Sequence, residues 1–312
     1  MRLRTVIAAL ATLVAPSEIA IAQFPSPASS DAPMSRPARC GAGIPDGETR
    51  GYIPLPRGDV FCPLVADPKA MTSFVSYLRG DAKDFASDVA SVGVADLFGL
   101  LRASGSTPGD GVQLSLAGGV FAQFDLGSAS YDLINADYVI GLPLTVRSGA
   151  FSARFRVYHQ SSHLGDEFLL RSTHPTRENL SFEAAEGLLS EDLGPLRVYG
   201  GGEYYIAREP SDLPNQIAHA GAELRPPGGL RFGSIGTARL IAGGDVKVVK
   251  PDAKVRYGIS ARAGLEIGRG HEGPEPSRRW SLVYEFYDGP SPYGQFFQSD
   301  VRLMGVGFHF TP

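Results

Sequence analysis

The sequence predicts an all-β protein, a closed antiparallel β-barrel that crosses a membrane with its strands. Three observations lead to this prediction: many segments in which apolar and polar residues alternate, charged residues placed in the polar phase of those segments, and an N-terminal export signal. The 38 glycines, 17 phenylalanines and 12 tyrosines also suit a chain of strands and tight turns. We therefore expect one large β domain.

The N-terminal residues 1–22 are predicted to be a secretory signal peptide. Two arginines precede an apolar run and a small-residue cleavage motif (Arg2, Arg4, 6–15 and Ala20-Ile21-Ala22). The apolar run is too short to cross a membrane as a helix. We expect the mature chain to begin near Gln23 and to be exported.

Residues 23–68 are expected to form a separate segment that precedes the barrel at 69–312. Residues 23–50 are rich in Pro, Ser, Ala and Gly, which indicates flexibility. Cys40 and Cys62 are the only cysteines, and in an oxidising compartment they are expected to form a disulfide. The net charge of −4 and the lack of a Lys/Arg run argue against nucleic acid as a partner.

The alternating segments predict twelve strands. Six segments have clear alternation, namely 112–126, 137–147, 151–161, 254–267, 280–287 and 304–310. Weaker alternation predicts four more strands, at 178–189, 195–207, 217–225 and 235–247. Segments 70–79 and 88–104 bring the count from ten to twelve, although the second of them also suits a short helix.

Strand length and aromatic placement favour a membrane barrel over a secreted β-sandwich or lipocalin-like barrel. Several segments are longer than the strands of soluble sandwiches. Trp280 and the terminal Phe308-His309-Phe310 suit the aromatic girdles of outer-membrane barrels. In the alternative, a soluble protein, the charged phase would simply be a solvated surface.

The segment 151–161 carries a histidine and a serine on its apolar face. Because side chains alternate along a strand, His159 and Ser161 share the face of Phe155 and Val157. With an even number of strands and both termini in the periplasm, this strand runs outward. His159 and Ser161 are therefore expected at the outer end of the barrel, facing lipid near the headgroups.

A lipid-facing His and Ser are costly, so the pattern indicates a function. Two positions apart on one face, Ser161 could act as a nucleophile and His159 as its base. The group that orients the base is expected from the next strand, as Glu178 or Asn179. Alternation with Leu180 would place Glu178 toward lipid and Asn179 toward the lumen. The alternative interpretation is a pair of interface residues that hydrogen-bond the loop they introduce.

His159-Gln160-Ser161 resembles the motif of the outer-membrane phospholipase A family, twelve-stranded barrels with Ser, His and Asn on the lipid-facing surface. This resemblance implies Asn179 as the third residue and a calcium ion, for which Asp166 and Glu167 are the nearby oxygen donors. The chain departs from that family after the serine, where Ser162-His163 replaces Asn-Gly. A His-x-Ser motif with a Glu also resembles the lipid A 3-O-deacylases, smaller barrels with a site on the outer wall.

A longer resemblance is to an uncharacterised bacterial family, a domain of unknown function. It rests on the segments Gly118–Asp125, Tyr158–Glu167 and Arg177–Ser181. It implies no activity, so two functions stay open. One is a lipid acyl hydrolase of the bacterial outer membrane that acts on membrane lipid, with a homodimer considered as its assembly. The other is a non-enzymatic barrel, either a narrow pore or a structural envelope protein.

Overall fold

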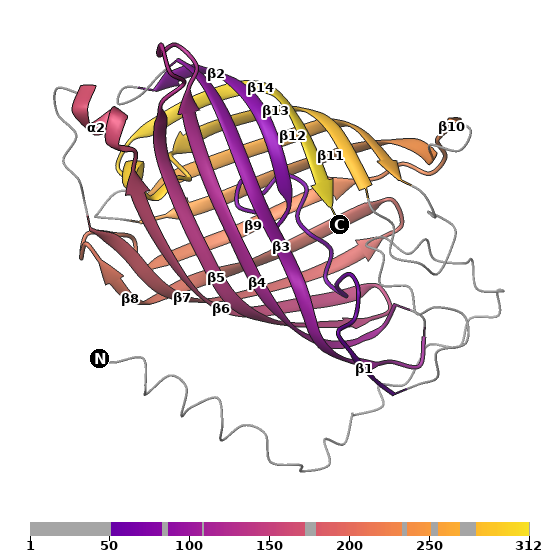
Figure 1. Cartoon of the computed structure of the whole chain (residues 1–312). Helices are drawn as coiled ribbons and strands as arrows, with labels where there is room; N and C mark the ends of the chain where they lie inside the picture. Colours follow the sequence, from indigo (N-terminus) through magenta and orange to yellow (C-terminus); the bar gives the residue numbers. More distant parts are fainter. Residues whose placement is uncertain are drawn as a thin grey trace. The chain divides into compact units, whose positions relative to one another are not determined.

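The computed structural model describes residues 51–82, 87–107, 109–171, 179–232, 236–250, 255–268 and 279–311 (Figure 1). The strands are β1 (Tyr52–Pro54), β2 (Ser73–Ala82), β3 (Asp88–Ser104), β4 (Gly111–Asp125), β5 (Leu133–Ser148), β6 (Phe151–Leu164), β7 (Leu180–Leu193), β8 (Leu196–Glu209), β9 (Gln216–Leu224), β10 (Leu230–Phe232), β11 (Gly236–Val249), β12 (Arg256–Gly268), β13 (Arg279–Pro290) and β14 (Asp300–Thr311). Two short helices, α2 (Asp166–Arg171) and η1 (Gly294–Phe296), follow β6 and β13. Nowhere in the described ranges is there a helix with the length and hydropathy needed to cross a membrane.

Twelve of these strands form a closed antiparallel barrel, which confirms the predicted fold class. Strands β2 to β9 and β11 to β14 follow one another around the wall, and β14 pairs with β2 to close it. The two uncertain segments at 70–79 and 88–104 are both wall strands, β2 and β3. The helical alternative for 88–104 is wrong, because β3 pairs along its length with β4.

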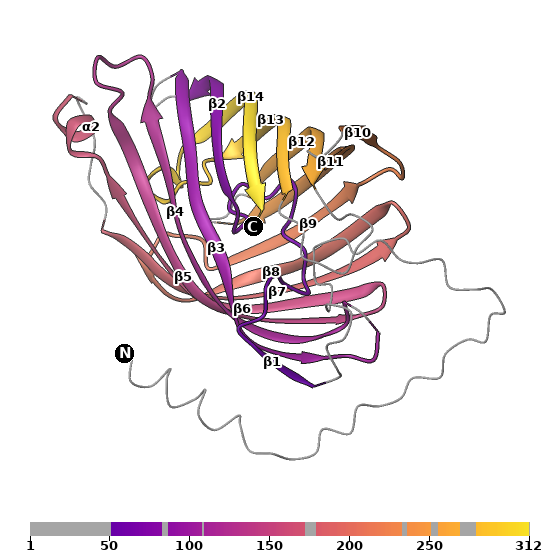
Figure 2. The same ribbon diagram turned by 45° about the vertical axis from the view of Figure 1, so that its right-hand side comes forward.

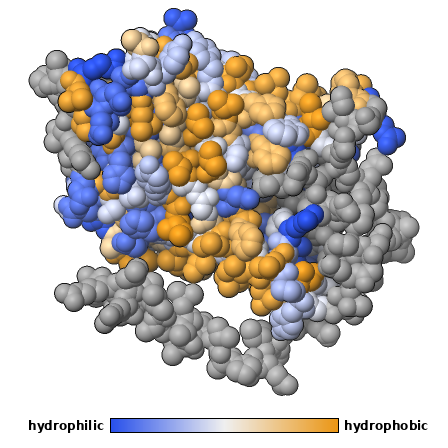
Figure 3. All heavy atoms as spheres, in the orientation of Figure 1, coloured by the Kyte–Doolittle hydropathy of each residue, from blue (hydrophilic) through white to orange (hydrophobic). Residues whose placement is uncertain are grey.

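Alternation separates an apolar outer face from a polar inner face. Val94 and Leu240 are 67% and 63% exposed on the outside, whereas Arg197 and Glu223 are fully buried inside. Figure 3 shows apolar residues gathered over the strands, with hydrophilic residues concentrated toward the end that carries α2. This distribution is typical of a barrel with lipid outside and a polar lumen.

One predicted face is wrong. Alternation predicts Leu180 on the lipid side together with Glu178, and with it every second residue of β7. Instead, Leu180, Phe182, Ala184 and Leu188 are all buried on the lumenal side. The ring of Phe182 stacks on Tyr205, with 4.1 Å between the ring centroids. The lumen therefore has apolar patches of its own. For this reason the apolar phase of a strand does not always face outward.

Residues 55–72, here called the plug, connect β1 to β2 and enter the lumen, where Val60, Phe61 and Leu64 are buried (Figure 2). Twelve strands enclose more space than side chains alone fill, because about eight strands already suffice for a filled interior. Wall arginines hold the plug by its backbone: Arg147 donates to the Val60 carbonyl, Arg197 to that of Cys62 and Arg262 to that of Val65, each at 3.0 Å. This segment was predicted to precede the barrel, and residues such as Val60 and Phe61 instead lie inside it.

Phe61 of the plug lies between two wall cations, with the guanidinium carbons of Arg154 and Arg197 at 5.0 and 4.7 Å from its ring centroid. Leu64 joins Phe61 in a small apolar cluster with Leu188. The predicted partner of Cys62, Cys40, lies outside the described residues. The disulfide, the signal peptide and the 23–50 segment therefore stay predictions.

The short strands β1 and β10 cover open edges of the wall. Strand β3 pairs with β2 as far as Gly93 and then continues to Ser104. Strand β1 pairs with residues 101–103 of this continuation. Strand β11 likewise pairs with β9 only from Ala242 onward. Strand β10 pairs with residues 236–238, which precede that ladder. Because unpaired backbone groups are costly, these two strands complete the wall where the stagger between neighbours is largest.

Candidate functional site

The outward direction of His159 and Ser161 follows from the burial pattern of β6. Both side chains are partly exposed, while Tyr158, Gln160 and Ser162 between and beside them are buried on the lumenal side. The two residues lie near the end of β6 that leads into α2, as expected. The opposite end of β6 joins β5 through the tight turn at Gly149 and Ala150.

The antiparallel register of β6 and β7 places Glu183 opposite His159. The two side chains meet on the outer face, with 3.1 Å between His159 Nδ1 and Glu183 Oε1. They are 43% and 44% exposed, so the pair stays accessible from outside. Glu183 is absent from the predicted site because the predicted phase of β7 is the opposite of the observed one. The loop between the two strands is too long for the sequence to fix their register.

Contact with Glu183 leaves the other imidazole nitrogen available. When Nδ1 carries the proton it donates to Glu183, and Nε2 then has a free lone pair on the face that Ser161 shares. No described side chain hydrogen-bonds the Ser161 hydroxyl. Glu183, His159 and Ser161 thus share one outer surface, and activation of the serine would require Nε2 of His159 to reach its hydroxyl.

The other predicted site residues are not part of this arrangement. Asn179 is exposed and precedes the first residue of β7, while Glu178 lies outside the described residues. Asp166 and Glu167 form the exposed first turn of α2. In the described ranges, no group of three or more His, Cys, Asp or Glu side chains is placed to hold a metal ion. The calcium expectation stays a prediction.

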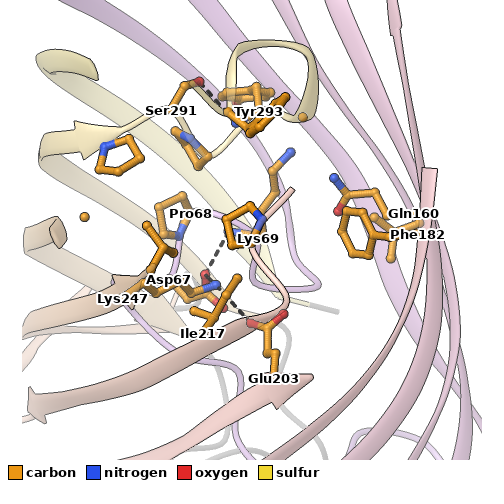
Figure 4. Close-up of a pocket in the computed structure, with 18 of the residues that line it drawn as sticks. Asp67, Pro68, Lys69, Gln160, Phe182, Glu203, Ile217, Lys247, Ser291 and Tyr293 are labelled. Atoms are coloured by element: carbon orange, nitrogen blue, oxygen red, sulfur yellow. Dashed lines mark hydrogen bonds and ion pairs between the residues drawn. The ribbon is translucent and has the colours of Figure 1, made fainter. Parts of the chain in front are cut away.

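A second polar site lies inside the barrel, in a cavity of about 140 Å³ that borders the plug (Figure 4). Lys247 lies between Asp67 and Glu203, with nitrogen–oxygen distances of 3.1 and 3.7 Å. Lys69 reaches Asp137 at 2.6 Å. The cavity is large enough for several water molecules.

The charges around this cavity lie close to charges of the opposite sign. Burial by itself raises the pKa of Asp67, but attraction to Lys247, His219 and Arg154 and a hydrogen bond from the Lys69 amide together hold this pKa well below its usual range. Burial lowers the pKa of Lys69, and the attraction of Asp137 offsets only part of this shift. Because each charge has a nearby partner, we interpret the lumenal network as what holds the plug in place.

Comparison with family models gives a match over residues 23–311 to a family described as "Protein of unknown function (DUF1207)". The chain belongs to this family. Membership agrees with the resemblance noted in the sequence and assigns no activity. A search of curated proteins returned no match.

Solved structures with a similar fold include outer membrane phospholipase A from Escherichia coli, at 12% identity and a TM-score of 0.50, covering 78% of this chain and 93% of that one. The Salmonella typhi outer membrane phospholipase, solved as a dimer with bound calcium, has 13% identity and a TM-score of 0.50. That match covers 78% of this chain and 93% of the phospholipase. An E. coli active-site mutant with an asparagine replaced by alanine gives the same values. At this identity the likeness shows the fold alone.

Proposed function

We propose that this protein is an outer-membrane β-barrel that hydrolyses an acyl ester of a membrane lipid. The observation that carries the proposal is the 3.1 Å contact between His159 and Glu183 on the outer face, with Ser161 two residues along the same face. A hydrolase of this kind meets its substrate in the bilayer, so its site belongs on the outside of the wall. The membrane location is supported by the apolar outer face and the polar lumen.

The proposed reaction follows from the roles of the three side chains. The Ser161 hydroxyl attacks the ester carbonyl and gives its proton to Nε2 of His159. Glu183 holds the imidazole and stabilises the imidazolium that forms. The tetrahedral intermediate expels the alcohol, which takes the proton from His159. Water then attacks the acyl-serine, with His159 as base again, and releases the fatty acid and free Ser161.

In one phospholipase structure with a similar fold, an active-site asparagine was replaced by alanine. In this chain we assign the orienting role to Glu183 rather than to the predicted Glu178 or Asn179. A carboxylate and an amide both offer an oxygen that accepts a hydrogen bond from an imidazole N–H. A glutamate in place of an asparagine can therefore still accept the hydrogen bond that orients the imidazole, and it adds a negative charge next to His159.

The test combines labelling with hydrolysis, on purified full-length protein in detergent. An alkylsulfonyl fluoride should modify Ser161, and Ser161→Ala should abolish both labelling and ester hydrolysis. The matched control is Ser181→Ala, because Ser181 lies opposite Ser161 in the β6–β7 register and is also partly exposed. Absence of labelling, together with equal hydrolysis by wild type and Ser161→Ala, would contradict the proposal and leave a structural ion pair at the rim.

Assembly is a separate proposal. One phospholipase with a similar fold was solved as a dimer with bound calcium. We propose that this chain also forms a homodimer in the membrane. Whether calcium affects the dimer is part of the measurement. Sedimentation in detergent with calcium and with a chelator tests this, and a monomer under both conditions would contradict it.

The non-enzymatic alternative of a narrow pore receives little support from the lumen. The plug is bound by wall side chains from β5, β8 and β12, so it crosses the interior rather than lining it. A passage for solutes would require the plug to move.

A further inference from the structure

A shallow groove on the outer wall begins at His159 and Ser161 and crosses β5 and β4 to β3. We call it the outer groove. Its lining residues are Val94, Gly118, Gly119, Val120, Tyr138, Val139, Ile140, His159 and Ser161. From β6 to β3 it spans three strand spacings, or roughly 14 Å. The groove is therefore long relative to a short acyl group.

The groove exists because an outward position of β4 has no side chain. Gly118 lies between the outward-facing Leu116 and Val120, and a Cβ added to it would meet nothing within 4 Å. The strand registers align Gly118 with Ile140 on β5, and Ile140 with His159 on β6. A single row across the wall thus leads from the missing side chain directly to the imidazole.

The rest of the lining is apolar where it is farthest from Ser161. Val94 and Ile140 are strongly exposed, so an apolar ligand would bury surface that the protein alone leaves uncovered. Nearer the serine, Tyr138 lies opposite Ser161 in the register, and its ring packs edge-on against His163 with centroids 5.8 Å apart. The polar end of the groove coincides with the proposed ester position, and the aliphatic end points away from it.

We propose that the outer groove binds the acyl chain of the ester attacked by Ser161, and that Gly118 sets the chain length which the site accepts. This inference rests on the proposed function and specifies its substrate class as long-chain acyl esters. The occupant is an aliphatic chain because the groove is continuous with the serine and because the part of its wall farthest from the serine is formed by Val94 and Val120.

The first experiment compares long and short esters on a variant that fills the groove. Gly118→Leu should fold normally, since the added side chain enters open space. We expect its kcat/KM for a palmitoyl ester to fall roughly tenfold, equivalent to about 1.4 kcal/mol, mainly through KM. Its kcat/KM for a butyryl ester should stay unchanged. Equal effects on both esters, or on neither, would overturn the proposal.

Gly244→Leu is the matched control. Gly244 is an exposed glycine on β11, and an added Cβ there also meets nothing within 4 Å. It lies on a strand that the groove does not reach. We expect Gly244→Leu to hydrolyse both esters like the wild type. A loss of palmitoyl activity in this variant would assign the effect to general perturbation of the lipid-facing wall.

A second measurement does not depend on hydrolysis. A phospholipid with a photoreactive diazirine at its acyl terminus, diluted in excess unlabelled lipid, is cross-linked to the inactive Ser161→Ala protein. Peptides with Val94 and Val120 should be labelled in excess over those of β11, and Gly118→Leu should remove the excess. Uniform labelling would overturn the proposal that the outer groove binds the acyl chain, even if the wild-type protein is a hydrolase. Labelling concentrated on these peptides, without any hydrolysis by the wild-type protein, would support acyl-chain binding in the outer groove and contradict the proposed function.

Discussion

Strands β6 and β7 carry two acid–base groups on opposite faces of the same ladder. Inside, Glu186 accepts hydrogen bonds from Arg154 Nε at 2.7 Å and Arg156 Nη2 at 2.6 Å. Outside, His159 and Glu183 meet at 3.1 Å. The inner carboxylate is 1% exposed, whereas the outer pair is more than two-fifths exposed.

This difference in burial separates a contact that stabilises the fold from one that stays accessible. A buried carboxylate shared by two guanidinium groups cannot lose either partner without leaving a charge in a poorly solvated place. A half-exposed pair contributes little to stability, because water and salt screen it. Its imidazole stays accessible to a substrate. The same ladder therefore supports the fold with its inner face and exposes the imidazole of His159 on its outer face.

The largest effect is expected for the inner group. Glu186→Gln leaves Arg154 and Arg156 without their shared carboxylate and should lower the free energy of unfolding by about 3–5 kcal/mol. Glu183→Gln, its counterpart on the outer face, should change this free energy by less than about 1 kcal/mol. Urea unfolding in detergent micelles measures both. Equal losses of unfolding free energy in the two variants would show that burial does not determine how much each carboxylate stabilises the fold.

The next prediction concerns hydrolysis by the outer pair. Glu183→Ala removes the group that orients His159 and should lower kcat roughly a hundredfold. Glu183→Gln should retain much more activity, because its amide oxygen can still accept from the imidazole. The measurement is steady-state hydrolysis of a micellar ester. If Glu183→Ala matched the wild type, Glu183 would have no positioning role.

A third prediction tests whether the plug depends on a close approach to the wall. A Cβ at Gly243 would lie 2.9 Å from the Cβ of Val65, so Gly243→Val should destabilise plug packing by about 1–3 kcal/mol. We expect channel openings in planar bilayers that wild type lacks. The adjacent Gly244→Val is the control, since it faces open space. Identical conductance from the two variants would contradict the blocking role of the plug.

The smallest effect is expected from the lumenal Asp67. Its pKa is lower in the folded protein than in the unfolded chain, because Lys247, His219 and the other neighbouring groups together outweigh the effect of burial. The ionised form is therefore favoured by folding, and this stabilisation is complete above the unfolded pKa of about 4 and lost as pH falls toward the lower folded pKa. The stability difference between wild type and Asp67→Asn should shrink below about pH 4. A difference independent of pH would rule out this linkage.

Local alternation determined much of this protein from its sequence. The period of two identified the wall strands and placed His159 and Ser161 on the outer face, because successive side chains of a strand point to opposite sides. The number of strands followed from counting the alternating segments. These properties depend on neighbours in sequence, so no tertiary information was needed.

The third member of the site was decided by tertiary structure. Glu183 meets His159 only through the register of β6 on β7, which the intervening loop does not encode. The phase of β7 was misread because Phe182 and Leu188 are apolar yet face the lumen, where Tyr205 and the plug cover them. Alternation gives the period of a strand, but which phase faces lipid depends on what fills the barrel, and that is settled by residues distant in sequence.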